Sequence, residues 1–366
     1  MIRGIPRRQF LIGAAASSLI PVLAKAETAD LPLRDAAKRA GLFWGAAVQS
    51  NQLKQESDFA ALVTRECSVV VPEWEMKWSA MERDRGRMKY GPADAIVNFA
   101  KQHRLNIRGH ALVWHRSMPA WAKEAMKDSA DWNVPASFIA AMLDRYSDDT
   151  FIHWDVLNEV IEPRDGRADG LRLSPYLHAF GPDYIRRALD LAHEHAPNVK
   201  LYINEYGLDY DGQVERDRRA TLLRLIESLK KAGVPFHGIG IQGHLYGRGK
   251  SKFSQESLRR FLADVAGHGL KITITELDVP EPDVSLPVEQ RDRYVTGEVT
   301  RYLDVVLDEP AVEGVVTWGL SDRYSWLNAR WRDAGTKNRG LPFDENLAPK
   351  PVTRAIIETL ARRRAR

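Results

Sequence analysis

The sequence predicts an α/β protein, a closed parallel (β/α)8 or TIM barrel that forms a single domain after an N-terminal signal peptide. Three observations support it. The chain has 366 residues, apolar runs alternate with amphipathic runs about eight times, and no linker or repeat interrupts the alternation. This length suits one large barrel, and the open doubly wound sheet is the alternative. The first apolar run is not followed by a G-x-G-x-x-G or G-x-x-x-x-G-K-[ST] motif, which argues against a nucleotide cofactor.

Residues 1–26 have the order of a signal peptide. A basic start precedes an apolar run, and Ala24-Lys25-Ala26 fits a small-x-small cleavage site. The segment Arg7-Arg8-Gln9-Phe10-Leu11 adds a twin-arginine pattern, typical of bacterial precursors exported in the folded state. The alternative is a short buried helix. We therefore expect a periplasmic or secreted protein, exported by the twin-arginine route, whose barrel occupies residues 27–366.

Charge and cysteine content exclude several classes of protein. Four of the 53 basic residues and none of the 49 acidic residues lie in residues 1–26, so the rest of the chain is balanced. This balance argues against a nucleic-acid partner. Cys67 is the single cysteine, which excludes an intrachain disulfide and a cysteine-based zinc site. We expect a monomer that has no membrane contact after cleavage of the signal.

Eight short apolar runs rich in Val, Ile, Tyr or Trp are typical of strands buried on both faces. They are Leu42–Gln49, Cys67–Glu73, Asn106–Trp114, Phe151–Glu159, Lys200–Tyr206, Gly238–Leu245, Lys271–Asp278 and Gly314–Asp322. Amphipathic segments between or after them predict helices, because prolines stand at helix starts and apolar residues recur at helical spacing. The clearest helices are Pro92–Arg104, Glu215–Ala232 and Pro351–Arg364.

Polar residues gather at the C-terminal ends of these strands, where the active site of a barrel lies. A carboxylate there costs free energy unless it is paired or used, so any single acid could be a structural ion-pair partner. The whole set favours an active site. It comprises Glu73, His110, Trp114, His115, Asn158, Glu159, Asn204, Glu205, Gln242, His244, Glu276, Asp278, Trp318 and Asp322.

Glu159 and Glu276 end the fourth and seventh predicted strands, which face each other across the barrel mouth. Two carboxyl groups beside a tryptophan-lined cleft suit acetal hydrolysis, because one protonates the departing oxygen and the other stabilises or traps the reacting carbon. Trp114, Trp318 and Trp326 offer flat surfaces to sugars, although each could be a core aromatic. This chemistry requires no metal and no cofactor. Zinc binding by His110 and His115 is disfavoured, because their spacing along a strand directs them to opposite faces.

Several motifs carry a family resemblance that extends from about Leu42 to Leu360. They are Glu75-Met76-Lys77-Trp78, Arg108-Gly109-His110-Ala111-Leu112-Val113-Trp114-His115, Trp154-Asp155-Val156-Leu157-Asn158-Glu159, Gly240-Ile241-Gln242-Gly243-His244, Thr275-Glu276-Leu277-Asp278, Trp318-Gly319-Leu320-Ser321-Asp322 and Phe343-Asp344-Glu345-Asn346. Together they resemble glycoside hydrolase family 10, best known as retaining endo-1,4-β-xylanases on a (β/α)8 barrel.

The resemblance implies a role for each matching residue. Glu159 matches the general acid/base, Glu276 the nucleophile, and Asn158 the residue that binds the 2-hydroxyl of the sugar being cleaved. His244 and Asp278 match the supports of the nucleophile. The implied substrate is a polysaccharide or oligosaccharide, by default xylan. Further residues match or border the sugar-binding walls: Glu73, Trp74, Lys77, His110, Trp114, Gln242, Tyr206, Trp318 and Trp326.

Three departures from the family pattern bear on specificity. Trp74 stands where the family has an Asn that contacts the second glycone sugar, so this subsite is expected to be blocked, narrowed or built for another sugar. The alternative is that Trp74 packs under a neighbouring loop. Ser117 replaces a Gln of the same region, and Asn204-Glu205-Tyr206-Gly207 departs from Asn-Asp-Tyr-Asn on the aglycone side.

Three other functions remain as alternatives. The same mechanism could act on a bacterial exopolysaccharide or a short decorated glycoside, which Trp74 and Ser117 favour. A non-catalytic glycan-binding barrel is disfavoured because both acids are present. A metal-dependent barrel hydrolase is disfavoured because the first strand, with the segment Trp44-Gly45-Ala46-Ala47-Val48-Gln49, lacks a His-x-His.

Overall fold

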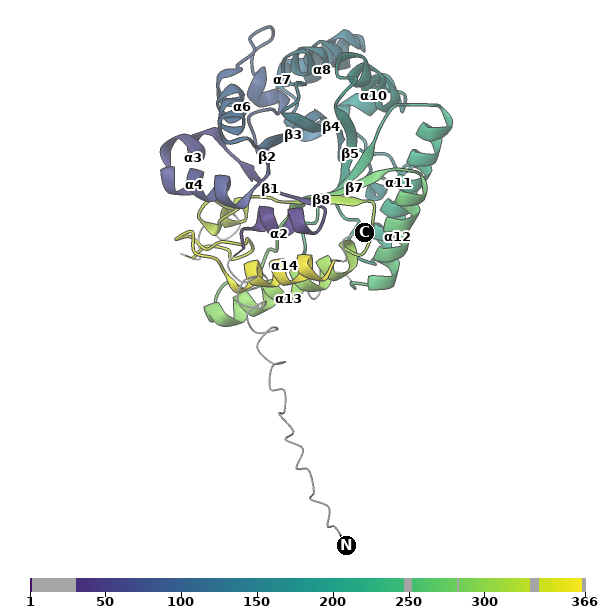
Figure 1. Cartoon of the computed structure of the whole chain (residues 1–366). Helices are drawn as coiled ribbons and strands as arrows, with labels where there is room; N and C mark the ends of the chain where they lie inside the picture. The colour runs from purple at the N-terminus through teal and green to yellow at the C-terminus, as the bar shows by residue number, and fades with distance from the viewer. Residues whose placement is uncertain (2–30, 247–251, 282, 330–335, 364–366) are drawn as a thin grey trace.

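The computed structural model describes Met1 and residues 31–246, 252–281, 283–329 and 336–363. Within these ranges, eight parallel strands form a closed barrel in the order β1-β2-β3-β4-β5-β6-β7-β8. Helices surround the strands on the outside (Figure 1). The predicted (β/α)8 barrel is confirmed. The predicted signal peptide lies outside the described residues, apart from Met1.

Each predicted strand overlaps one observed strand. The strands are β1 (Phe43–Val48), β2 (Val69–Pro72), β3 (Asn106–Trp114), β4 (Phe151–Asn158), β5 (Lys200–Glu205), β6 (Gly238–Ile241), β7 (Lys271–Leu277) and β8 (Val312–Thr317). The prediction of Gly314–Asp322 for the last strand was wrong at both ends. Gly319 has φ of 106°, a conformation that turns the chain away from the barrel and that side chains rarely adopt.

Apart from α2, which precedes β1, the α-helices follow the strands as the alternation predicts. They are α2 (Leu33–Arg39), α3 (Ser50–Gln55), α4 (Ser57–Glu66), α5 (Trp78–Met81), α6 (Gly91–His103), α7 (Ala120–Ser129), α8 (Asn133–Arg145), α9 (Pro175–Phe180), α10 (Tyr184–His195), α11 (Gln213–Lys231), α12 (Gln255–Gly267), α13 (Val288–Val306) and α14 (Pro351–Arg362). Short 3-10 turns are η1 (His115–Ser117), η2 (Pro163–Asp165) and η3 (Asp322–Tyr324). None of the helices in the described ranges is long and apolar enough to span a bilayer.

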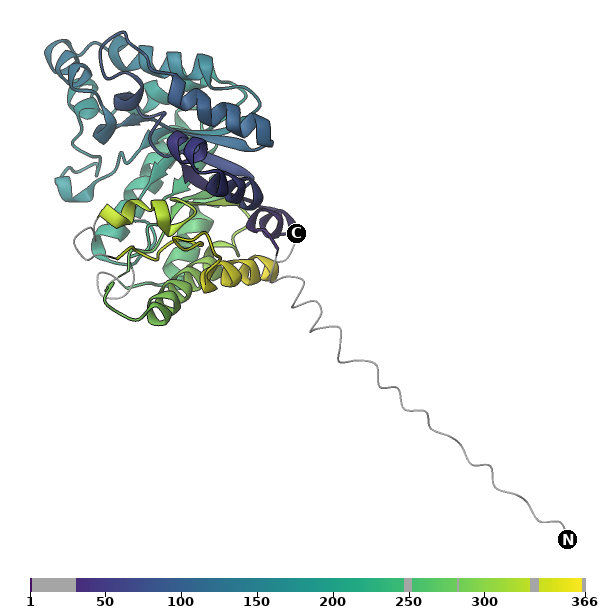
Figure 2. The ribbon, with the colours of Figure 1, turned by 90° about the vertical axis from the view of Figure 1, so that its left-hand side faces the viewer.

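The helix boundaries have local causes. Pro92 and Pro351 stand in the first turns of α6 and α14, where a missing N–H removes no helical hydrogen bond. Arg104 adopts a left-handed conformation with φ of 56° and ends α6. Figures 1 and 2 place α2 beside α14, and the two helices are in contact, so the first and last described helices meet on the outside of the barrel.

A polar cluster lies inside the barrel below the site. The buried Asp155 carboxylate on β4 accepts hydrogen bonds from the Arg108 guanidinium and binds Nδ1 of His110 at 3.0 Å, both on β3. Arg108 Nη1 also lies 3.1 Å from Nδ1 of His153. Buried charges are tolerated when they are paired and hydrogen-bonded in this way. The cluster therefore fixes the orientation of the His110 ring from within the barrel.

Candidate active site

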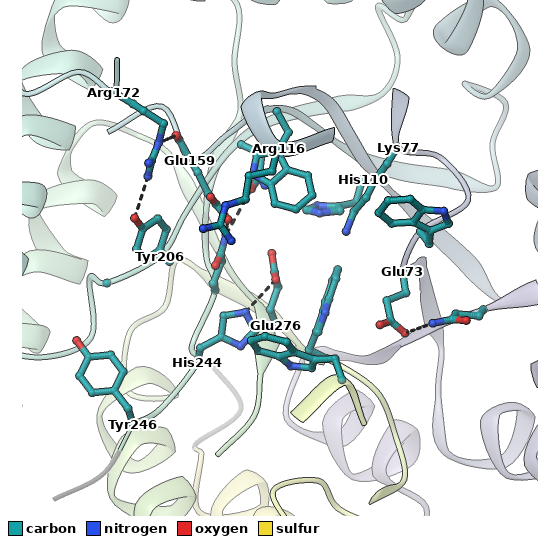
Figure 3. A pocket seen from close by; sticks show the side chains of 18 of the residues that line it. Glu73, Lys77, His110, Arg116, Glu159, Arg172, Tyr206, His244, Tyr246 and Glu276 are labelled. Carbon is teal, nitrogen blue, oxygen red and sulfur yellow. Dashed lines mark hydrogen bonds and ion pairs between the residues drawn. The ribbon is translucent and has the colours of Figure 1, made fainter. Parts of the chain in front are cut away.

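A cleft of about 680 Å³ opens where the strands end (Figure 3). All of the residues predicted to act on or bind the substrate line it, except Asp278; of the wider strand-end set, His115, Asn204, Glu205 and Asp322 do not line it either. The two candidate acids come from opposite sides of the barrel, because Glu159 directly follows β4 and Glu276 lies near the end of β7. The structure therefore brings residues that are distant in sequence together at one cleft. The residues it brings together are Asn158, Glu159, Glu276, His244, Glu73, Trp74, Lys77, His110, Trp114, Gln242, Tyr206, Trp318 and Trp326.

Glu276 is a buried carboxylate with a partner on each oxygen. Its side chain is surrounded so that the residue is 5% exposed. His244 Nε2 lies 3.1 Å from Oε2, and Asn204 Nδ2 donates a 2.8 Å hydrogen bond to Oε1. Burial alone would raise the pKa of Glu276, but the hydrogen bond to His244 and the positive charges of His110, His244 and Lys77 lower it to about 2. Glu276 is therefore ionised at neutral pH.

His244 is held in turn by hydrogen bonds that run through Asp278 to Trp326. Its Nδ1 lies 2.8 Å from Asp278 Oδ1, and Trp326 Nε1 donates a 2.6 Å hydrogen bond to Asp278 Oδ2. Burial opposes protonation of His244, but the charges and hydrogen bonds of Asp278 and Glu276 raise its pKa well above the ordinary value. A protonated His244 donates to both carboxylates. Asp278 supports this arrangement without reaching the cleft wall.

The Asn204 amide connects the two sides of the site. Its Nδ2 donates to Asn158 Oδ1 at 2.9 Å as well as to Glu276, and its Oδ1 accepts a 2.7 Å bond from Thr275 Oγ1. Gly240 on the neighbouring β6 leaves the space for this amide, because a Cβ there would lie 2.2 Å from Asn204 Oδ1. A glycine is therefore needed at position 240, because a side chain there would displace the Asn204 amide.

Glu159 has a different environment. Its backbone is left-handed, with φ of 58°, a conformation that costs a non-glycine residue roughly 1–3 kcal/mol. Two hydrogen bonds hold it there: Glu159 N–H donates to Asn204 O at 2.9 Å, and its carbonyl accepts from Arg172 Nε at 2.6 Å. Its carboxylate receives only a long 3.4 Å contact from Gln242 Nε2 among the described residues. Backbone geometry, rather than side-chain bonds, therefore directs this carboxyl into the cleft.

Aromatic rings surround a lysine on the β2 side of the cleft. The ammonium of Lys77 lies 4.6, 5.4 and 5.7 Å from the ring centroids of Trp114, Trp318 and Trp74. Burial lowers the pKa of Lys77, although Glu276, Glu73 and Glu159 oppose this. Trp74 is 50% exposed, so the alternative that it packs under a neighbouring loop is wrong. It forms part of the cleft wall.

Glu73 lies on the same wall of the cleft, whereas Ser117 is not part of it. Gln49 Nε2 donates a 3.1 Å hydrogen bond to Glu73, and burial raises the pKa of Glu73. Ser117 does not line the cleft; it is buried, with its hydroxyl 2.9 Å from that of Ser79. The expectation that Ser117 contributes directly to specificity is not supported by this placement.

Tyr206 and several residues that the sequence did not single out as site residues complete the lining of the cleft. The Tyr206 hydroxyl donates to Glu162 at 2.7 Å and accepts from Arg172 at 2.8 Å, which fixes its ring. The unpredicted lining residues follow strand ends or lie in loops, where no periodicity marks them. They are Gln49, Arg116, Arg164, Arg172 and Tyr246; Gly207, one of the predicted departures from the family pattern, also lines the cleft.

The placement of His115 differs from the expectation. It lies in turn η1 beyond the end of β3, so the argument that it faces away from His110 along one strand was wrong. Burial and the charges of Arg172 and Arg116 lower the pKa of His115 to about 4. In the part of the chain that is described, no group of three or more His, Cys, Asp or Glu side chains could hold a metal ion.

The comparison with known families gives a direct match. The family model "Glycosyl hydrolase family 10" matches residues 32–359. The chain belongs to glycosyl hydrolase family 10. This family 10 chain is 30% identical to endo-1,4-beta-xylanase B of Thermotoga neapolitana over 98% of both chains, and 31% identical to endo-1,4-beta-xylanase 2 of Claviceps purpurea over 86% of this chain and 87% of that one.

Solved family 10 structures resemble the barrel over most of its length. Native xylanase 10B from Thermotoga maritima matches with a TM-score of 0.79 and 30% identity, covering 90% of this chain and 98% of that one. Xylanase 10B from Thermotoga petrophila RKU-1, solved in complex with xylobiose, matches with a TM-score of 0.79 and 30% identity over 91% and 98% of the two chains. The predicted family and fold are thus both confirmed.

Replacing His244 tests the electrostatics of this family 10 site. In His244→Ala, buried Glu276 loses a hydrogen bond and a positive charge, so its pKa rises from about 2 toward or above the ordinary value of 4.5. Carbon NMR of glutamate-labelled protein measures this, with Glu276→Gln to assign the signal. A Glu276 signal that still titrates near 2 in the variant contradicts the role of His244.

The same change alters the pH dependence of stability. Because the folded-state pKa of Glu276 lies below its unfolded value, its contribution is present above about pH 4.5 and is lost as the pH falls toward about 2. The raised pKa of His244 gives a contribution present below its unfolded pKa and lost as the pH rises through the folded one. Urea unfolding at several pH values should show both contributions only in the unsubstituted protein.

Proposed function

We propose that the protein is a retaining glycoside hydrolase that cleaves β-1,4-xylosidic bonds in xylan or xylo-oligosaccharides. One observation carries this proposal: two carboxyl groups with unequal surroundings share one cleft, Glu276 buried and ionised, Glu159 with few contacts. Pairs of acids whose environments differ in this way divide the roles of nucleophile and acid. Relatives named endo-1,4-beta-xylanase support the choice of substrate.

The proposed mechanism has two displacements. Glu276 attacks the anomeric carbon while Glu159 gives its proton to the glycosidic oxygen, so the C–O bond breaks and a covalent glycosyl-enzyme forms. Water then attacks the same carbon as Glu159 takes its proton, and the Glu276 carboxylate is released. Asn158, fixed by Asn204, is placed to bind the 2-hydroxyl of the reacting sugar. The proton of Glu159 leaves with the departing sugar in the first step and is replaced from water in the second, so both carboxyl groups return to their starting states.

Removing Glu159 tests the division of roles. In Glu159→Ala, hydrolysis of substrates with poor leaving groups should fall by roughly 10²–10⁴-fold, whereas activated aryl glycosides should lose far less, because they need little protonation. Azide should restore activity on the aryl substrates and give a glycosyl azide. NMR of the first-formed product of the unsubstituted enzyme should show a retained anomer.

A matched control is available on the outside of the barrel. Glu124→Ala, on the exposed face of α7, should leave all of these activities unchanged. Equal losses on both substrate types in Glu159→Ala, or an inverted first product, would refute the proposed mechanism.

A second candidate function keeps this mechanism but changes the substrate to a bacterial exopolysaccharide or a short decorated glycoside. The exposed indole of Trp74 on the cleft wall favours it, because the ring occupies space beside Glu73 and Lys77 where a second glycone sugar would bind. Binding energy from a second sugar, away from the bond that is cleaved, helps the enzyme to reach the transition state. The loss of this energy lowers the rate of the chemical step as well as the affinity for substrate. Activity on polymeric xylan would then be low relative to short substrates.

Replacing Trp74 tests this second candidate. Trp74→Asn should raise kcat/KM on xylotetraose by about 1–3 kcal/mol, roughly five- to 150-fold, if one sugar contact is restored. Trp74→Phe, which keeps an aromatic ring, is the matched control and should give no such gain. Ser117→Gln is left out of the test because Ser117 is buried against Ser79. An unsubstituted enzyme that already produces a normal xylobiose and xylotriose ladder from xylan would contradict the candidate.

We further propose that the protein is exported by the twin-arginine route to the periplasm or the medium. The support is the order of residues 1–26 alone. Arg7→Lys combined with Arg8→Lys should leave the precursor in the cytoplasm, and the exported form should begin at or near Glu27. Fractionation and N-terminal sequencing measure this, and export of the double variant through the general secretory route would argue against a folded passenger.

A further inference from the structure

Arg116 is a charged cleft residue that the proposed mechanism does not use. It lies in η1, directly beyond β3, is exposed, and lines the cleft. Within the described residues its guanidinium makes no hydrogen bond or ion pair. The two other cleft arginines differ from it. Arg164 binds Glu162 through Nε at 2.9 Å and Nη2 at 2.8 Å, and Arg172 binds the Glu159 carbonyl and the Tyr206 hydroxyl.

The position of Arg116 points to the leaving-group side of the cleft. Figure 3 shows its side chain reaching into the cleft beside Glu159 and away from Glu73. Glu159 is the proposed proton donor, so groups on its side face the departing part of the substrate. Glu162, an acid whose charge acts on the neighbouring His115, is already bound by Arg164, Arg218 and Tyr206. The positive charge of Arg116 is therefore available to a ligand.

The chemistry of guanidinium suggests which ligand this is. Its planar donors match the two oxygens of a carboxylate, and such charge-assisted pairs are stronger than hydrogen bonds to neutral hydroxyl groups. Away from Arg116, the cleft carries the carboxyl groups of Glu73 and Glu276, which disfavour an anionic substrate there. An anionic sugar would thus be accepted in one region and rejected in others, which gives specificity.

We propose that Arg116 forms a subsite for the carboxylate of a uronic acid carried by the substrate on the Glu159 side of the scissile bond. This inference rests on the proposed glycosidase function and names its substrate class more closely. A neutral xylan chain leaves the guanidinium without a partner, whereas a glucuronyl branch supplies one.

The test compares two polymers of the same shape. Glucuronoxylan carries the carboxylate, and glucuronoxylan whose carboxyl groups have been reduced to hydroxymethyl groups does not. The unsubstituted mature enzyme should prefer the acidic polymer, measured as a ratio of kcat/KM values. Arg116→Met should lower this ratio by about three- to tenfold, and Arg116→Lys should lower it less because a point charge remains. The preference should also shrink in high salt.

Arg259→Met is the matched control. Arg259 is a partly exposed arginine on α12 that pairs with Asp308 at 3.1 Å, outside the cleft, and its loss should leave the ratio unchanged. A ratio that Arg116→Met does not alter, or an unsubstituted enzyme with no preference for the acidic polymer, overturns the Arg116 proposal alone. An enzyme inactive on both polymers instead contradicts the xylan proposal, and the Arg116 proposal falls with it.

Discussion

The geometry of the site depends on one amide group, that of Asn204. A single nitrogen donates to Asn158 and to Glu276, while the residue's backbone carbonyl accepts from Glu159 N–H, so β4, β5 and β7 are tied at one point. A planar amide has fixed donor directions, and it cannot keep both bonds if the strands slide. Gly240 makes its position possible by leaving β6 without a side chain there. The spacing between Glu159 and Glu276 is thus set by hydrogen bonds between strands and by the space that Gly240 leaves for the Asn204 amide.

The chemical difference between the two acids follows from where each stands on its strand. Glu276 lies within β7 and is enclosed, so burial strengthens its interactions with His244 and the nearby positive charges. Glu159 lies one residue beyond β4, in a left-handed conformation, and the cleft rather than the barrel interior surrounds its carboxyl group. The same residue type therefore receives two roles from a difference in position along parallel strands, without a metal in the proposed scheme.

The sequence predicted the barrel and most of the site because both depend on periodic, buried segments. Apolar runs marked each strand, and polar residues such as Glu276 and Gln242 interrupted those runs where the strands end. Arg116, Arg164 and Tyr246 escaped prediction because loops have no such period and a surface arginine has the same sequence appearance as a cleft arginine. The C-terminal end of β8 was misplaced because the predicted run continued through Leu320 to Asp322, whereas the turn at Gly319 takes these residues into a loop.

Two residues proposed to set specificity, Trp74 and Arg116, are separable from the catalytic network, unlike Trp326, which donates a hydrogen bond to Asp278. Trp74 and Arg116 make no hydrogen bond from their side chains to Asn204, His244 or Glu276 among the described residues, so changes at either position leave the catalytic network intact. Lys77 is the one link, since its ammonium lies 5.7 Å from the Trp74 ring and its charge helps to keep Glu276 ionised. A cation–π contact at an exposed ring contributes about 0.5–1 kcal/mol, too little to reposition a buried ammonium that two further rings enclose. The scaffold therefore permits the sugar specificity to change at strand ends while the acid pair remains as it is.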